Sequence, residues 1–160
     1  MPSEKMRYMR ARHGPDSPIE FNDLLRHLRS FGIKDLSEIL WIRAQHDDLL
    51  RRILTVTAAI PLCAGDFKKG KSAIDFALYL PDFVTYDIEN GYGQLLDAIH
   101  VGIERLADDG DRASALQLAQ YAIEQAQAAL ERFAEGRDWR CAIERLCELA
   151  EKLSTESKSV

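Results

Sequence analysis

Residues 116–153 contain two apolar series in which hydrophobic residues recur at alternating steps of three and four. This spacing keeps each series on one face of an α-helix, so it predicts two amphipathic helices. The connection at residues 135–138 is short enough to force the two helices to fold back on each other. The series are Leu116, Ala119, Ile123, Ala126, Leu130 and Phe133, then Trp139, Ile143, Leu146, Ala150 and Leu153. An antiparallel helical hairpin is therefore expected here.

Helix start signals recur along the preceding part of the chain. Ser17-Pro18-Ile19-Glu20 combines an N-cap residue, a proline at the first helical position and an acid three residues after the cap. Asp35 and Asp47 are expected to cap the next two helices. Ser72 is expected to cap a short fourth helix that Pro81 interrupts.

A longer helix is expected from about Asp87 to Asp109. Gly102 on its packed face predicts the close approach of a neighbouring helix. Gly110 is expected to end this helix and Asp111 to cap the next, so the acidic run favours a turn over a calcium loop. The residues expected to face inward are Tyr92, Leu95, Leu96, Ile99, Ile103 and Leu106.

These signals predict an all-α fold, an antiparallel helical-hairpin array of six or seven helices. Its architecture is expected to be a TPR/HEAT-like helical repeat or an irregular bundle. The predicted organisation is a flexible basic N-terminal arm at 1–16, one helical domain at 17–153 and a polar tail at 154–160. A chain of 160 residues is long enough for one such domain with a real core.

Charge and cysteine usage narrow the cellular setting and the partners. A formal net charge of −5 argues against a nucleic-acid binder, whose domain is usually basic. No uncharged run approaches the roughly 20 apolar residues of a membrane span, and no secretory signal is recognised. Cys63, Cys141 and Cys147 form no C-x-x-C pair, which is typical of reduced thiols. A cytoplasmic protein without a membrane association is therefore expected.

Residues 65–72 match the pattern G-x-x-x-x-G-K-[ST] of the phosphate-binding loop. Gly65, Gly70, Lys71 and Ser72 occupy its defined positions. In such a loop backbone amides surround the phosphates, the lysine neutralises them and the serine holds Mg²⁺. The loop must follow a buried strand, and no strand is predicted upstream, so a lysine-rich turn between helices is the preferred interpretation. No cofactor is expected.

No other pattern in the sequence assigns a chemical activity. His100 and Glu104 share a helical face, but a metal site needs more ligands at matched spacing. No catalytic residue and no metal ligand is therefore predicted. Helical periodicity does not assign four of the aromatic residues to a buried helix face. These four are the candidate lining of a partner groove beside residues 81–92. They are Trp41, Phe83, Tyr86 and Tyr92, for which the competing interpretation is core packing.

Six stretches between residues 36 and 149 resemble an uncharacterised bacterial α-helical domain. They are Ala44-Gln45-His46-Asp47-Asp48-Leu49-Leu50-Arg51-Arg52-Ile53-Leu54, Ala73-Ile74-Asp75, Asp82-Phe83-Val84-Thr85-Tyr86, Leu96-Asp97-Ala98-Ile99, Ala119-Gln120-Tyr121-Ala122-Ile123-Glu124-Gln125 and Ala129-Leu130-Glu131. That domain has a tetratricopeptide-like character and is found alone or following SWIM-type zinc fingers. The resemblance implies a helical interaction module and transfers no functional residue, since this chain has no cysteine–histidine finger.

The function expected from the sequence is a helical protein–protein interaction scaffold without catalytic activity. Stacked hairpins expose grooves that bind a protein or peptide and need no catalytic group. One alternative is a nucleotide-binding protein or NTPase that uses the residue 65–72 pattern. Another is a nucleic-acid-associated accessory protein that uses the basic arm. The sequence favours a non-enzyme, leaves a homo-oligomer open and does not identify the partner.

Overall fold

The computed structural model describes residues 21–80, 86–132 and 137–157. These residues form seven α-helices and one 3₁₀ helix, and they contain no strand, so the predicted all-α class is confirmed. The elements are α2 (Phe21–Arg29), α3 (Ile33–Ala44), α4 (Asp48–Ala59), η1 (Pro61–Cys63), α5 (Phe67–Leu78), α6 (Tyr86–Asp108), α7 (Arg112–Arg132) and α8 (Arg137–Ser157). None of these helices combines the length and apolar character needed to cross a bilayer.

The chain divides into two compact units, Met1–Ile42 and Arg43–Val160. The single domain expected over 17–153 spans both of them. The first unit contains α2 and most of α3, and no side chain described between residues 22 and 43 is buried. α3 begins at Ile33, so Asp35 lies in its first turn and is not the predicted cap. The basic arm expected at 1–16, the Ser17 cap and Pro81 lie outside the described residues.

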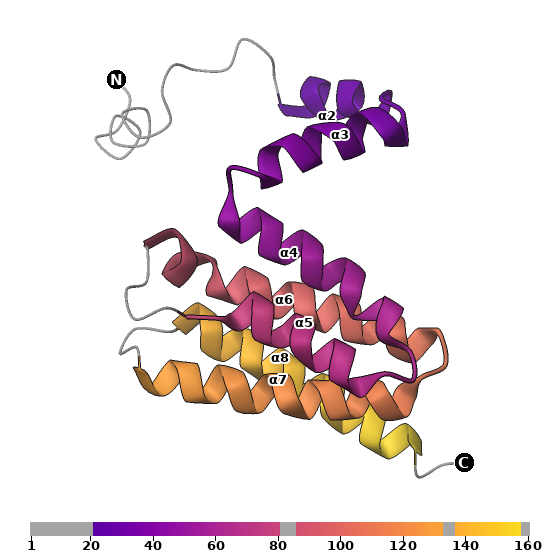
Figure 1. Cartoon of the computed structure of the whole chain (residues 1–160), viewed down its shortest axis with the longest axis vertical. Helices are drawn as coiled ribbons and strands as arrows, with labels where there is room; N and C mark the ends of the chain where they lie inside the picture. The colour runs from indigo at the N-terminus through magenta and orange to yellow at the C-terminus, as the bar shows by residue number, and fades with distance from the viewer. Residues whose placement is uncertain (1–20, 81–85, 133–136, 158–160) are drawn as a thin grey trace. The chain divides into compact units, whose positions relative to one another are not determined.

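The second unit is built around α6, which contacts α4, α5, α7, α8 and η1. Figure 1 shows α4 and α5 running antiparallel, and α6, α7 and α8 reversing direction in turn. The inward face predicted for α6 is confirmed, because all six of its residues are 0–1% exposed. The predicted antiparallel hairpin is formed by α7 and α8, which pack along each other.

The buried face of α7 agrees with the predicted one in part, since Ala119 and Ala126 are fully buried as predicted. Leu116, Ile123 and Leu130 are only partly buried, whereas the fully buried positions are mostly alanines. The reason is that α7 contacts α5, α6 and α8, and a helix with neighbours on several sides needs small residues where the backbones approach closely. Phe133 lies outside the described residues. The buried residues of α7 are Ala115, Leu118, Ala119, Ala122, Ala126 and Ala129.

The predicted face of α8 is largely confirmed. Trp139, Ile143, Leu146 and Leu153 are buried, and Ala150 is partly buried. The helix continues to Ser157, so the expected polar tail begins as helix.

Aspartate side chains cap the starts of three helices in the second unit, α4, α5 and α7. Asp47 accepts a hydrogen bond from the Leu50 amide at 3.0 Å, and Asp111 accepts one from the Ser114 amide at 3.1 Å, as predicted. Gly110, at φ 106°, separates α6 from α7 in a backbone conformation that favours glycine. These caps confirm the interpretation of the acidic run as a turn.

The start of α5 is earlier than predicted. The helix begins at Phe67 and is capped by Asp66, whose carboxylate accepts from the Lys69 amide at 3.1 Å. Ser72 is not a cap, because it lies inside the helix and its hydroxyl donates to the Lys68 carbonyl at 3.0 Å. Lysine is a good helix former, so the segment that follows the Asp66 cap joins the helix rather than forming a turn before it.

Candidate binding pocket

The four aromatic residues of the predicted groove have different environments. Trp41 belongs to α3 and is 67% exposed. Tyr92 belongs to α6 and is only 1% exposed, and its ring packs against Trp139 with centroids 4.2 Å apart. Tyr92 is thus part of the core, and its side chain is not available to line an open groove. Phe83 and the side chain of Tyr86 lie outside the described residues.

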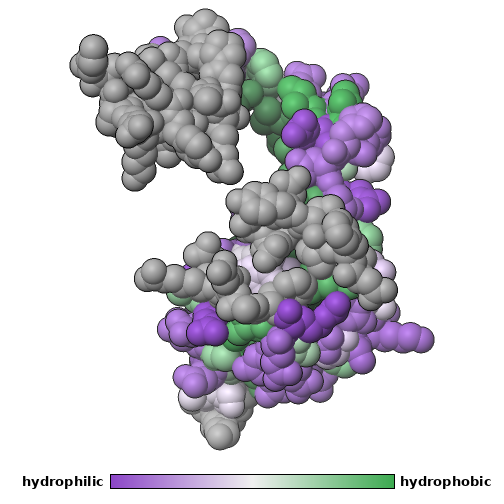
Figure 2. Space-filling view, turned by 90° about the vertical axis from the view of Figure 1, so that its left-hand side faces the viewer, coloured by the Kyte–Doolittle hydropathy of each residue, from purple (hydrophilic) through white to green (hydrophobic). Residues whose placement is uncertain are grey.

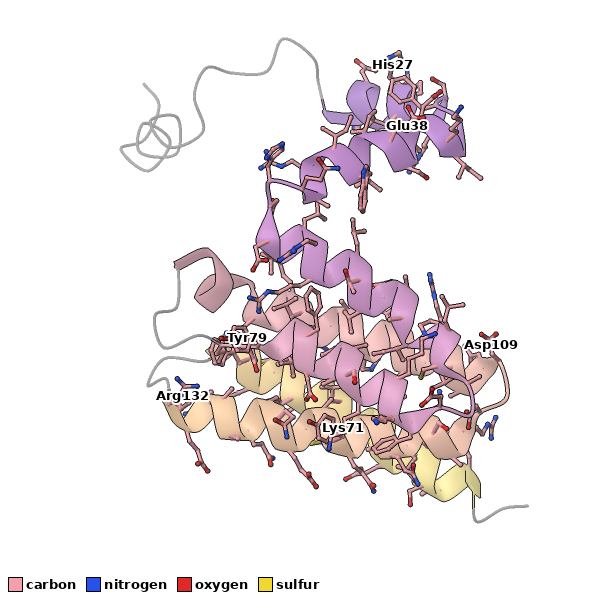
Figure 3. The ribbon with its side chains drawn as sticks, viewed as in Figure 1. His27, Glu38, Lys71, Tyr79, Asp109 and Arg132 are labelled. Carbon is pink, nitrogen blue, oxygen red and sulfur yellow. The ribbon has the colours of Figure 1, made fainter. Side chains whose placement is uncertain are left out.

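A pocket of about 280 Å³ lies beside Tyr92. It is formed where α5 and α7 end, and Figure 3 shows Tyr79 and Arg132 at this same end of the second unit. Figure 2 is viewed from the side on which these helix ends lie. The lining residues are Asp75, Leu78, Tyr79, Leu80, Tyr92, Gln125, Ala128, Ala129 and Arg132.

The hydroxyl group of Tyr92 is buried and has no hydrogen-bond partner among the described residues. Burial raises the pKa of this phenol well above its usual range, although the nearby charge of Arg52 opposes that shift. The hydroxyl therefore stays protonated at neutral pH and remains a hydrogen-bond donor. Leaving a buried donor unsatisfied costs roughly 1–3 kcal/mol, which makes this atom the most unusual polar group of the pocket.

Arg52 fixes the end of α5 next to the pocket. Its side chain is buried at 7% exposure, and its Nη1 donates to the carbonyls of Tyr79 at 2.5 Å and Ala77 at 3.3 Å. Its Nε donates to Asp48 at 2.8 Å. Partial burial raises the pKa of Asp48, but Arg51 and Arg52 together outweigh that effect and lower it. A cation at a helix C-terminus satisfies carbonyls that have no partner within the helix.

Asp75 forms a second polar group on the pocket wall. Tyr121 of α7 donates its hydroxyl to Asp75 of α5, and Lys71 lies over the Tyr121 ring with Nζ 4.7 Å from the centroid. Burial and the bond to Asp75 raise the pKa of Tyr121 to about 12. No local pattern in the sequence marks Tyr121, Asp75 or Arg52, because the residues that contact one another are distant in sequence.

The residue 65–72 segment does not have the geometry of a phosphate-binding loop. From Phe67 onward it is helical, and the Lys69 and Gly70 amides point to the Asp66 carbonyl at 3.2 and 3.3 Å. The Asp66 carboxylate also occupies the helix start, where a phosphate would bind. Gly70 has a packing role instead, since a Cβ there would lie 2.7 Å from Leu118 Cδ1 and 2.8 Å from Cys63 Sγ.

Among the residues that the structure describes, the other possible metal ligands form no cluster of three. His100 and Glu104 approach to 3.6 Å as an isolated pair. Within the described ranges, no three histidine, cysteine or acidic residues are placed to hold a metal ion. The three cysteines are free, and burial raises the pKa of the Cys63 thiol.

Comparisons with known proteins provide no further assignment. No protein-family model, curated protein or solved structure matches the chain. The resemblance to a tetratricopeptide-like bacterial domain therefore stays a prediction, and the site is interpreted from the geometry of this chain.

Proposed function

We propose that this chain is a helical protein–protein interaction module, and that its partner docks on α3. The observation that carries the proposal is a set of large hydrophobic side chains exposed on this one helix. We name this set the α3 apolar surface: Ile33 at 86%, Ile39 at 51%, Leu40 at 45%, Trp41 at 67% and Ile42 at 61% exposure. Figure 2 shows green, hydrophobic atoms at the surface of the α2–α3 unit.

Large apolar residues at this density are unusual on a free surface. Contiguous apolar surface exposed by a protein usually marks an interaction site. Ile33 and Leu40 are seven positions apart and lie on one face of α3, Trp41 and Ile39 flank that face on its two sides, and Ile42 lies on the opposite side of the helix. Burial of apolar surface stabilises a complex by roughly 25 cal/mol per Å², and tryptophan is among the residues most enriched at the centre of interfaces.

The short helices of the first unit support the same proposal. Helices of 9 and 12 residues are marginal in water without packing on an apolar face. None of the described side chains of this unit is buried, so the packing that stabilises such helices is incomplete. A protein partner that offers a complementary apolar face would supply it, and this function needs no catalytic group. The three free cysteines support a cytoplasmic location for the complex.

The proposal is tested by identifying a partner through crosslinking and mass spectrometry and measuring its affinity as a purified protein. Trp41→Ser is expected to weaken binding by about 30-fold, the loss typical of a central tryptophan. Leu62→Ser is the matched control, because Leu62 is 73% exposed but lies on η1 of the second unit. Equal affinities for the Trp41 variant and the parent chain would contradict docking on α3.

A further inference from the structure

We propose that the surface between α7 and α8 binds a basic amphipathic helix of a partner protein. A groove of about 420 Å³ lies between these two helices, which Figure 1 shows side by side. We name it the α7–α8 groove, and its lining residues are Gln120, Ala150, Glu151, Ser154 and Thr155. It belongs entirely to the second unit, so the proposal is independent of docking on the α3 apolar surface.

A stripe of partly exposed apolar residues on α7 lies along this groove. Leu116, Ile123 and Leu130 follow one another at steps of seven residues, so they share one edge of the helix. Leu118 and Tyr121 lie against α5, and the edge opposite to them faces α8. The stripe spans about 21 Å, which is the length of a partner helix of about 14 residues.

The facing edge of α8 carries small residues. Cys147, Ala150 and Ser154 recur at steps of three and four, and all three are partly buried. The described helices that pack along α8 are α6 and α7, and no described helix closes the α7–α8 groove from outside. The apolar stripe of a third helix fits between the large side chains of α7 and the small ones of α8.

Four exposed carboxylates flank the groove, two on each helix. We name them the acidic rim: Glu124, Glu131, Glu144 and Glu151. The two members on each helix are seven residues apart and so lie along one side of it. Burial raises the pKa of the Cys147 thiol, and the charges of Glu151 and Glu144 raise it further, as expected of carboxylates beside this edge. Lysine or arginine side chains of a partner helix complement this rim.

Few basic side chains offset the acidic rim. Arg112 and Arg145 form ion pairs at 3.1 and 2.6 Å with acidic residues outside the rim. Arg132 lines the pocket at the ends of α5 and α7, and Lys152 lines a separate pocket between α6 and α8. Among the basic side chains described on α7 and α8, only Arg140 remains on the groove side. The rim therefore keeps an excess of negative charge, which selects a basic partner over an acidic one.

The test measures the binding of three fluorescently labelled peptides of about 14 residues to the full chain by anisotropy. The first peptide has leucine at helical steps of three and four and lysine at the other positions. The second has glutamate in place of lysine, and the third keeps lysine but has glutamine in place of leucine. The leucine–lysine peptide is expected to bind saturably, with a Kd at least about tenfold below those of the other two. Absence of saturable binding, or equal or tighter binding of either other peptide, would overturn the proposal.

Charge reversal on α8 tests the place of binding. The double variant Glu144→Lys, Glu151→Lys is expected to raise the Kd of the leucine–lysine peptide at least about tenfold at an unchanged Tm, because both side chains are exposed. The matched control is Glu38→Lys, Asp109→Lys, which changes the net charge equally at exposed positions outside the groove. Less than about a twofold change is expected for the control. Equal losses in the two double variants would show only a general attraction for a cationic peptide and would overturn the proposal.

Trp41→Ser separates this site from the α3 apolar surface. The leucine–lysine peptide is expected to bind this variant with the Kd of the parent chain, because Trp41 belongs to the first unit. An increase in ionic strength from about 50 to about 300 mM is expected to raise the Kd at least about threefold, since salt screens exposed charges. Loss of binding in Trp41→Ser would place the peptide on α3, and an affinity that salt leaves unchanged would contradict the role of the acidic rim.

Discussion

The two units of this chain use apolar residues in opposite ways. Half of the residues from 21 to 42 are hydrophobic, a share similar to the 46% of the whole chain. In the second unit such residues form one continuous core through α4, α5, α6, α7 and α8. In the first unit the described apolar residues are exposed or only partly buried. Hydrophobic content therefore does not by itself create a core, because burial needs several helices around a shared centre.

The second unit has that centre in α6. This helix contacts each of the other four α-helices of its unit, so most of its residues between 91 and 107 are buried. Among the described residues of the first unit, α2 and α3 have no such third element, and α3 leaves the α3 apolar surface open. A pair of short helices cannot enclose large side chains, which is why a partner protein is proposed for this region.

The largest expected difference between the units comes from the same substitution at two isoleucines. Ile103→Ala in α6 is expected to lower the free energy of unfolding by about 2–5 kcal/mol, because Ile103 is fully buried. Ile42→Ala in α3 is expected to change it by less than about 0.5 kcal/mol, because Ile42 is 61% exposed. Urea denaturation of both variants checks the pair, and similar losses would break the comparison.

A smaller difference is expected from two glycines. Gly70→Ala places a Cβ within 3 Å of both Leu118 and Cys63, so the destabilisation by overpacking is expected to exceed the gain in helix propensity by about 1–2 kcal/mol. Gly32→Ala in the first unit meets its nearest atom at 3.7 Å, an ordinary contact, and is expected to be nearly neutral. Thermal unfolding of the two variants provides the measurement, and a neutral Gly70→Ala would mean that α5 and α7 are packed less closely.

The smallest expected effect concerns the cap of α7. Asp111→Ala removes an N-cap and is expected to lower the stability of the second unit by about 1 kcal/mol at pH 7. The Gly65 amide, with a second contribution from Ser114, lowers the pKa of Asp111 in the folded chain. This stabilisation is therefore present above the unfolded pKa near 3.8 and is lost as the pH falls through the lower folded pKa.

The pH dependence separates the cap from a general acid effect. The difference in unfolding free energy between the parent chain and Asp111→Ala is expected to shrink between about pH 5 and pH 2.5. Asp23→Ala in α2 is the control, because Asp23 is exposed and pairs only with Arg26 at 3.3 Å among the contacts described for it. A constant difference for Asp111→Ala across this range would contradict the role assigned to its carboxylate.

The features that the sequence predicted are those encoded within a few residues. The inward face of α6 and the caps Asp47 and Asp111 follow from helical periodicity and from side chains that bond to amides three positions away. The Gly102 contact was also predictable, since a Cβ there would lie 3.1 Å from Ile60 Cβ. Each of these signals is local.

The features that the sequence did not predict depend on long-range packing. The predicted apolar series of α7 missed four buried residues, Ala115, Leu118, Ala122 and Ala129. An alanine-rich face has little hydrophobic contrast, so the larger, partly buried residues of α7 determined most of the predicted series. The start of α5 was predicted at Ser72, whereas the helix is capped by Asp66 and includes the lysine-rich stretch that was expected to be a turn. Tyr121 donates a hydrogen bond to Asp75 of the pocket wall across 46 residues of sequence, and no short motif encodes such a contact.

The most direct test of the difference between the units is acrylamide quenching of the two tryptophans. The chain contains two, Trp41 at 67% and Trp139 at 3% exposure. Trp139→Phe reports on Trp41 alone, and Trp41→Phe reports on Trp139 alone. We predict strong quenching and red-shifted emission for Trp41, and weak quenching and blue-shifted emission for Trp139. Equally weak quenching of both tryptophans in the chain without a partner would contradict an exposed α3 apolar surface.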